Sequence, residues 1–214
     1  MCSLDFSWFN SGHFVDVIEW IGTFAFAISG IRLAAKKDFD LFGAYVVGLL
    51  TAIGGGTIRD LLLQTNPFWM SNSRYMICTA VALLFVILFR KHIVKLNITF
   101  FIFDTIGLAL FTVVGIEKTL GFGHPFWVAA IMGTITGVAG GVLRDICIAE
   151  IPLIFRKEIY ASSCLLGCLC YYICNYIGIS LVANQLLTSF VIILSRVIAV
   201  KNGIGLPKLK SESD

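Results

Sequence analysis

Charged residues are scarce in this chain: only 14% of its 214 residues are Asp, Glu, Lys or Arg, whereas 58% are hydrophobic. Soluble domains carry about 25% charged residues. A water-soluble fold of this length buries only about 70% of its surface, so it could not hide this much apolar surface from water. The mean hydropathy of +0.91 agrees with this argument. We therefore expect an integral membrane protein surrounded by membrane lipid.

The patterns of several other protein classes are also missing. Aromatic and basic residues are not interleaved as they are in nucleic-acid-binding proteins. The seven cysteines lack the paired two-residue spacing of structural zinc sites, and most of them fall in apolar segments. There is no GxSxG elbow, and the glycine run lacks the Lys-Ser/Thr of a P-loop. The sequence predicts no enzyme, no metal site, no resident cofactor and no nucleic-acid partner.

Long apolar runs, in contrast, are abundant. A spanning helix needs about 20 mostly apolar residues, and these runs are too long for the strands of a membrane barrel. They predict seven transmembrane helices. The candidate spans are residues 14–35, 41–64, 75–90, 98–117, 125–149, 158–178 and 181–200.

The positions of Lys and Arg predict the orientation. With seven spans, one side of the membrane receives twelve of the sixteen Lys and Arg residues, including Arg32 and Arg196, and the other side receives only Arg74 and Lys118. The positive-inside rule then predicts an inner-membrane protein with its N-terminus outside and its C-terminus in the cytoplasm. No Lys or Arg precedes Arg32, so the positive n-region of a cleaved signal peptide is absent and we expect the first span to be retained.

The two halves of the chain are copies of one unit. A shift of 85 residues aligns them without a gap, and it superposes glycines, an Arg-Asp pair and a proline. Each copy holds three spans, so the second copy enters the membrane from the opposite face. Inverted repeats are typical of transporters and some channels, with the functional path near the repeat interface; duplication for packing alone is the alternative. The predicted organisation is an outside segment 1–13, inverted repeats 14–91 and 98–178, a seventh helix 181–200 and a cytoplasmic tail 201–214.

The central motif is TAIGGGTIRD at residues 51–60, which is echoed by TGVAGGVLRD at residues 136–145. Each glycine inside a helix costs about 1 kcal/mol relative to Ala, and a run of glycines lets the backbone kink or open. We therefore expect the second and fifth spanning helices to be broken at these glycines, with the opened backbone along a polar path. The alternative is close helix packing, in which small residues let two backbones approach.

Both motifs end in an Arg-Asp pair, which places ionisable groups at membrane depth. Such groups cost about 2.5–3.5 kcal/mol at a helix centre, so they normally face the bundle interior and are paired. Sequence neighbours on a helix do not face each other, so each charge requires a partner elsewhere. Similar depth in the membrane predicts the pairs Glu19 with Arg59 and Asp104 with Arg144. These pairs either line the path or only hold helices together.

Hydroxyl groups near these charges could solvate an ion, although Ser and Thr often bond to their own helix backbone. Lys118 could line a mouth of the path or mark a helix end. The residues assigned to the path are Gly54, Gly55, Gly56, Arg59, Asp60, Gly140, Gly141, Arg144, Asp145, Glu19, Asp104, Ser29, Thr51, Thr136 and Lys118.

These motifs resemble those of the bacterial branch of the trimeric intracellular cation channel family. The resemblance rests on FAISG at residues 26–30, GGGTIRDLL, DTIGLALFTVVG and GGVLRD followed by Ile-Pro, and it covers about residues 16 to 180. It implies a homotrimer with one pore per protomer, second and fifth helices kinked at the glycines, and conduction of monovalent cations, chiefly potassium, with sodium also permeant. Some bacterial relatives are described instead as transporters of a small solute such as glycine, and this alternative stays open.

Two positions depart from the family pattern. Ala139 stands where the second repeat usually has its first glycine, so a kink there would be stiffer. Glu19 stands where an aspartate is usual. Animal members carry a lysine-containing motif in place of Arg-Asp, so their gating does not transfer to this chain.

Overall fold

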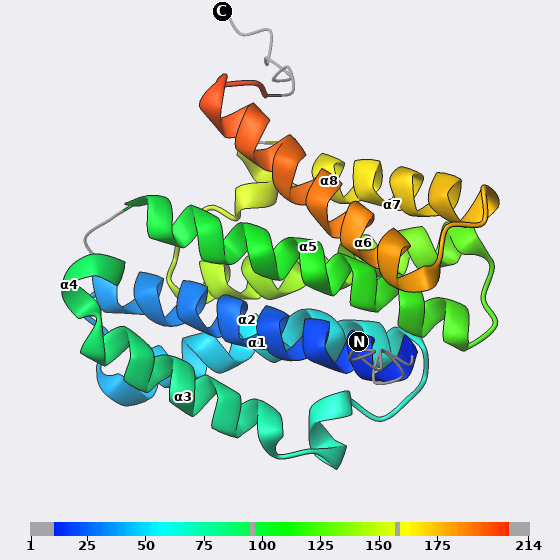
Figure 1. The fold of residues 1–214 in the computed structure, drawn as a ribbon. Coiled ribbons are helices and arrows are strands. Elements are labelled where there is room, and N and C mark those ends of the chain that lie inside the picture. Colours follow the sequence, from blue (N-terminus) through cyan, green and yellow to red (C-terminus); the bar gives the residue numbers. More distant parts are fainter. Residues whose placement is uncertain (1–10, 95–96, 157–158, 206–214) are drawn as a thin grey trace, which may run out of the picture.

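The computed structural model describes residues 11–94, 97–156 and 159–205, and every regular element in these ranges is helical. Seven principal helices form one bundle, which confirms the predicted all-α fold (Figure 1). The predicted outside segment and tail fall largely outside the described residues. The principal helices are α1 (Ser11–Lys36), α2 (Leu41–Leu62), α3 (Arg74–Leu88), α5 (Asn97–Gly121), α6 (Phe126–Cys147), α7 (Ala161–Tyr176) and α8 (Leu181–Lys201), and the short elements are η2 (Phe68–Ser71), α4 (Arg90–Ile93) and η3 (Leu153–Phe155).

Five of the helices are long and apolar enough to cross a membrane, namely α1, α2, α5, α6 and α8. The helices α3 and α7 have only 15 and 16 residues. At 1.5 Å per residue they are about 22–24 Å long, less than the ~30 Å of a bilayer core. Each of them follows a 3-10 turn that begins after a proline, Pro67 or Pro152. The third helix of each repeat is therefore shortened in the same way.

The two repeats meet through reciprocal contacts. Helices α1 and α5 lie side by side and run in opposite directions (Figure 1). The rings of Phe26 and Phe111 stack with centroids 5.3 Å apart. Gly22 faces the ring of Phe111, and Gly107 faces the ring of Phe26. The same glycine–phenylalanine contact thus occurs twice, with the two repeats exchanging roles. Such reciprocal contacts are expected when a two-fold axis relates the two repeats.

The glycine-rich helices α2 and α6 are not broken. Both are continuous α-helices through the glycine run, so the expected opening is absent and the packing alternative is correct for this conformation. A Cβ atom on Gly55 would collide with the carbonyl oxygen of Thr136, and one on Gly140 would collide with that of Thr51. The glycines let the two backbones approach. An unbroken helix also bonds the backbone groups of the glycine run within itself, and in a membrane each unsatisfied group would cost several kcal/mol.

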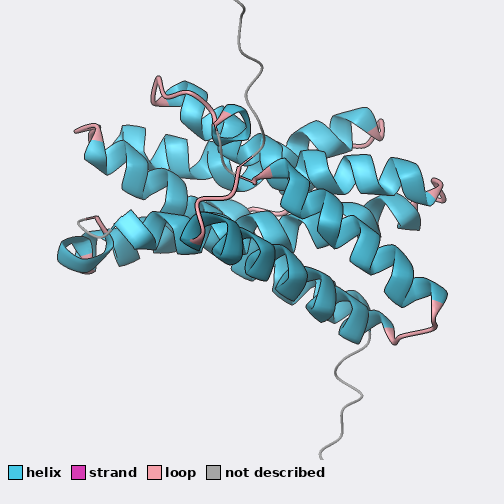
Figure 2. Ribbon diagram, turned by 90° about the horizontal axis from the view of Figure 1, so that it is seen from above, coloured by secondary structure: helices cyan, strands magenta, loops and turns pink. Residues whose placement is uncertain are grey.

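The seventh principal helix, α8, lies outside the repeats and packs on α7 and α5. Seen from above, the long helices lie beside one another with the connecting loops at their ends (Figure 2). Its contact with α5 places α8 beside the buried charges of the second repeat.

Candidate functional site

The aspartates of the two motifs close helices α2 and α6 in the same manner. Asp60 Oδ2 accepts a hydrogen bond from the backbone N–H of Phe68 at 2.9 Å, and Asp145 Oδ2 accepts one from Leu153 at 3.0 Å. Both donors begin the 3-10 turn that follows the proline. Each carboxylate therefore ties its helix end to the loop, and both aspartates are buried.

Each arginine of the motif bonds to the aspartate beside it in sequence. Arg59 Nε donates to Asp60 Oδ1 at 2.8 Å, and Arg144 Nε donates to Asp145 Oδ1 at 2.9 Å. The expectation that sequence neighbours cannot pair was wrong. Adjacent side chains leave a helix in different directions, but the three methylene groups of arginine let its Nε atom fold back to a carboxylate that the following turn holds in place.

Asp104 of α5 is the centre of the second charge cluster, which we define as Asp104, Arg144, Asp145 and Arg196. Arg144 Nη1 donates to Asp104 Oδ1 at 2.5 Å, so the predicted pair of these two residues is confirmed. Arg196 Nη1 of α8 donates to Asp104 Oδ2 at 2.7 Å. The Tyr160 hydroxyl also donates to Asp104, and Arg144 Nη1 donates to Ser29 Oγ at 2.7 Å.

The first charge cluster, which we define as Arg59, Asp60 and Lys118, is less enclosed. Lys118 Nζ of α5 lies 3.0 Å from Asp60 Oδ1, and its side chain keeps 31% of its surface exposed. Arg59 is fully buried, yet neither its Nη1 nor its Nη2 atom has a hydrogen-bond partner among the described residues. No ion pair joins Glu19 to Arg59 in the described part of the chain, so this predicted pair is not formed.

Glu19 has a different neighbour. It interacts with the Tyr75 hydroxyl, and the charge of Arg59 still acts on it. The Nε atom of Arg59 instead bonds to Asp60, whose carboxylate is already fixed by the backbone of the following turn.

The predicted hydroxyl ligands divide into two groups. Ser29 joins the second charge cluster as described. Thr51 Oγ1 donates to the carbonyl of Val47 and Thr136 Oγ1 to that of Met132, both at 2.6 Å, so both hydroxyls are used within their own helices. The remaining predicted glycines lie against side chains: Gly54 against Leu143, Gly56 against Phe68 and Gly141 against Tyr160.

Sequence reasoning missed two buried arginines. Arg196 and Arg32 were counted among the cytoplasmic loop charges, but each is only 1% exposed. Arg32 Nε donates to the carbonyl of Ile93 at 2.7 Å. Their burial could have been predicted from their position, because both lie inside predicted spans, where a charged side chain rarely faces lipid.

A cavity of about 520 Å³ reaches the edge of the second charge cluster. It is bounded by Asp145 and by the ends of α1 and α6. At its rim Glu150 lies 2.6 Å from Lys37 and 3.1 Å from Arg156. These ion pairs connect the turn after α1, which contains Lys37, to the loop after α6. They also lower the pKa of Glu150, chiefly through the hydrogen bond from Lys37.

Comparison with known proteins places this arrangement in a family. A family model described as "Glycine transporter" matches the chain twice, at residues 16–91 and 101–176. The chain is 36% identical to the inner membrane protein YadS of Escherichia coli (strain K12) over 195 residues, which is 89% of this chain and 93% of that protein. It is also 36% identical to a membrane protein of Vibrio cholerae serotype O1, over 89% of this chain and 81% of that protein.

Solved structures show the same relation. A channel described in work on conductance through TRIC cation channels has a TM-score of 0.82 and 33% identity, covering 93% of this chain and 98% of its own. The TRIC orthologue from Rhodobacter sphaeroides has a TM-score of 0.84 and 31% identity, covering 89% and 99%. A TRIC channel from C. elegans has a TM-score of 0.60 at 12% identity, which shows the fold alone.

The fold and the paired charge clusters thus define a membrane protein of two inverted three-helix repeats and a seventh helix. The chain belongs to the bacterial branch of the trimeric intracellular cation channel family.

Proposed function

We propose that this protein is a monovalent cation channel, permeable to potassium, that works as a homotrimer with one pore in each protomer. The observation that carries the proposal is the similarity to solved cation channels along nearly the whole chain, at more than 30% identity. The repeated Arg-Asp motifs agree with it, because charges buried at membrane depth are costly and usually mark a functional path.

The proposed path passes through both charge clusters. On one side the cavity of about 520 Å³ ends at Asp145. On the other side Lys118 is partly exposed and contacts Asp60. Between them α2 and α6 touch where Gly55 meets Thr136 and Gly140 meets Thr51. We propose that this contact is the barrier of a closed channel, and that conduction requires α2 and α6 to move apart.

The proposed orientation has the N-terminus outside and the cavity at Asp145 facing the cytoplasm of the cell. It follows from the excess of Lys and Arg on that side. A cysteine at the exposed position Phe122, in the turn after α5, is expected to react with an impermeant maleimide from outside, whereas one at Phe155 is not.

The experiment that tests the channel is reconstitution of the purified protein into liposomes, with single-channel recording in potassium and glycine uptake measured in the same preparation. We expect discrete unitary currents without saturable glycine uptake. Asp60→Asn and Asp145→Asn should change the unitary conductance, while the matched control Arg74→Gln, at the exposed start of α3, should not. Native mass spectrometry of the same sample tests the trimer.

Transport of glycine is the second candidate, favoured by the description of the family model. A glycine carrier needs free amides or charges around a compact pocket. The amides at Gly54 to Gly56 belong to an unbroken helix, and Gly55 contacts the neighbouring backbone. Saturable uptake of glycine without unitary currents would overturn the channel proposal and place the substrate site elsewhere.

A further inference from the structure

A third polar cluster lies between α5, α7 and α8, apart from both charge clusters. Glu117 Oε1 of α5 accepts a hydrogen bond from the Tyr171 hydroxyl of α7 at 2.8 Å and another from Gln185 Nε2 of α8 at 2.7 Å. Each of these residues lies four or five positions from an end of its helix, which is about 6–8 Å at 1.5 Å per residue. The three side chains therefore meet at one depth, at the end of the bundle opposite the Asp145 cavity.

Glu117 brings a negative charge to this cluster, and its side chain is partly buried. No ion pair joins it to a Lys, Arg or His among the described residues. Lys118, its neighbour in the sequence, contacts Asp60 instead. Ionisable groups at membrane depth are normally paired, and two neutral donors do not cancel a charge. The described part of the chain thus provides hydrogen bonds to this carboxylate but no cation.

Gln185 provides a second and independent observation. Its side chain is fully buried, and its Oε1 atom has no hydrogen-bond partner among the described residues, although Nε2 of the same amide donates to Glu117. A buried amide oxygen without a donor is costly, and such an atom often marks the place of a water or an ion. A carboxylate and an unpartnered amide oxygen, joined by one hydrogen bond, both attract positive charge.

The first repeat resolves the same position in the opposite way. The shift of 85 residues superposes Arg32 on Glu117. Arg32 Nε donates to the carbonyl oxygen of Ile93 at 2.7 Å, so there the chain places its own cation against an oxygen atom. In the second repeat the oxygen atoms are present at the corresponding position, and the residue that could carry the cation is itself an acid.

We propose that Glu117 and Gln185 form a binding site for one alkali-metal cation, sodium or potassium, between α5, α7 and α8. Carboxylate and amide oxygens are the ligands that hard cations prefer. A single carboxylate balances one positive charge, whereas a divalent ion would leave an excess charge in a partly buried site. The bound cation would hold α8 against the second repeat. This site lies outside the proposed conduction path, because α5 directs Lys118 to Asp60 and Glu117 to α7 and α8.

The test is thermal unfolding of the full-length protein in sodium, potassium or choline chloride at equal ionic strength. A ligand that binds only the folded protein stabilises it by mass action, so we expect the melting temperature to rise with sodium or potassium concentration. Glu117→Gln keeps an oxygen that can accept from Tyr171 but removes the charge, and it should lose this rise. Asp60→Asn, which alters the proposed path, should keep it.

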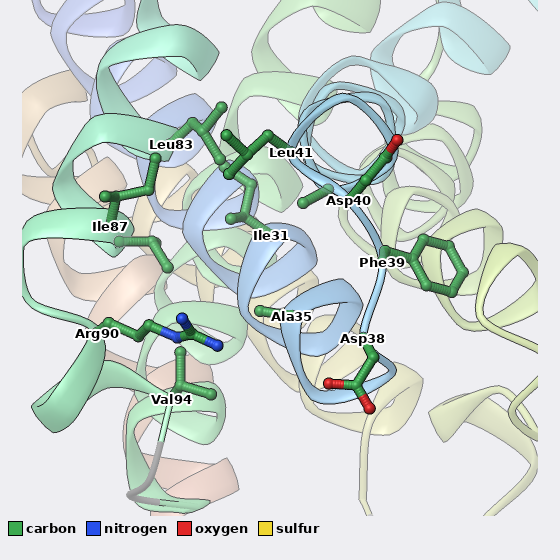
Figure 3. Close-up of a pocket in the computed structure, with 12 residues that line it drawn as sticks. Ile31, Ala35, Asp38, Phe39, Asp40, Leu41, Leu83, Ile87, Arg90 and Val94 are labelled. Atoms are coloured by element: carbon green, nitrogen blue, oxygen red, sulfur yellow. The ribbon is translucent and has the colours of Figure 1, made fainter.

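Asp38→Asn is the matched control for loss of one negative charge. Asp38 is exposed in the turn after α1, at the edge of a different cavity that Ile31, Ala35 and Arg90 also line (Figure 3). Its φ of 58° is one that asparagine also adopts, so the change should not disturb the turn. We expect the dependence on sodium and potassium to be the same in this variant as in the wild type.

Infrared difference spectroscopy provides a second measurement in case Glu117→Gln lowers stability by itself. Replacement of choline by sodium over the wild-type protein should shift a carboxylate band, and this shift should be absent in Glu117→Gln. An equal rise in melting temperature in wild type and Glu117→Gln, or loss of the rise only in Asp60→Asn, would overturn the proposal. A melting temperature that follows pH but not alkali-metal concentration would overturn it in favour of a protonated Glu117.

Discussion

The two charge clusters begin from the same motif and end with different degrees of enclosure. In both, an arginine bonds to the next aspartate, and that aspartate accepts a backbone N–H from the following 3-10 turn. The second cluster then receives Asp104 and Arg196, both buried, and its arginine also bonds Ser29. The first receives the partly exposed Lys118. Among the described residues, Nη1 and Nη2 of Arg59 have no hydrogen-bond partner and its guanidinium lies over the Phe68 ring, whereas in Arg144 only Nη2 has none.

This difference indicates that the two charge clusters have different roles. A buried network in which both carboxylate oxygens of Asp104 are occupied holds α5, α6 and α8 in one arrangement. A cluster with a partly exposed lysine, and with an arginine that forms fewer hydrogen bonds, has weaker constraints on its geometry. We therefore expect the second cluster to act mainly as an anchor, and the first to be the more mobile end of the proposed path.

The largest expected effect is the loss of the anchor. Asp104→Asn leaves Arg144 and Arg196 buried without their carboxylate, and removal of one partner of a buried ion pair typically costs about 3–5 kcal/mol. We expect a large fall in thermal stability and in the yield of monodisperse protein in detergent. The matched change in the first repeat, Glu19→Gln, breaks no ion pair and should cost far less. Equal losses in both variants would show that the clusters are equivalent.

The next effect concerns the contact between α2 and α6. Gly55→Ala and Gly140→Ala each insert a methyl group against a backbone carbonyl, and overpacking of this kind costs about 1–3 kcal/mol. We expect lower thermal stability together with greater potassium flux in liposomes, because the two helices are forced apart. Gly121→Ala is the control, since the added Cβ meets no other part of the protein within 4 Å beyond the neighbouring backbone of its own helix. A loss of flux in Gly55→Ala would argue against this contact as the barrier.

A smaller effect separates the third cations of the two clusters. Lys118→Gln removes a partly exposed ion pair worth about 1 kcal/mol or less, so stability should hardly change while unitary conductance changes. Arg196→Gln removes a buried partner of Asp104 and should lower stability clearly more. Thermal unfolding of both variants beside single-channel recording checks this, and a purely structural effect of Lys118 would contradict the assignment of a mobile end.

The smallest effect is a pH dependence at the cavity rim. The pKa of Glu150 is lowered in the folded protein by Lys37, so its stabilising contribution is present above its unfolded pKa and is lost as the pH falls through the lower folded value. Glu150→Gln should flatten the dependence of melting temperature on pH below about 4.5. The corresponding residue of the first repeat is Thr65, which carries no charge, so Thr65→Ala should leave that dependence as in the wild type.

Much of the site could be predicted from the sequence where the argument rests on position along the chain. The repeat register placed both Arg-Asp pairs, and depth in the span matched Asp104 to Arg144 correctly. The same reasoning failed for Glu19 and Arg59, because depth alone does not say which of two nearby carboxylates a flexible arginine reaches. It also missed Arg196, because a charge near a helix end looks like a loop charge until its neighbours are known.

The sequence by itself determined the membrane class, the seven helices and the inverted repeats, because hydropathy, span length and repeat register are properties of the chain in one dimension. Only the tertiary structure decided whether the glycines break α2 and α6 or pack them together, since this depends on what lies opposite each glycine. It likewise decided that Lys118 completes one cluster and Arg196 the other. Those partners come from distant helices, and the distance between helices is set by packing that no local pattern records.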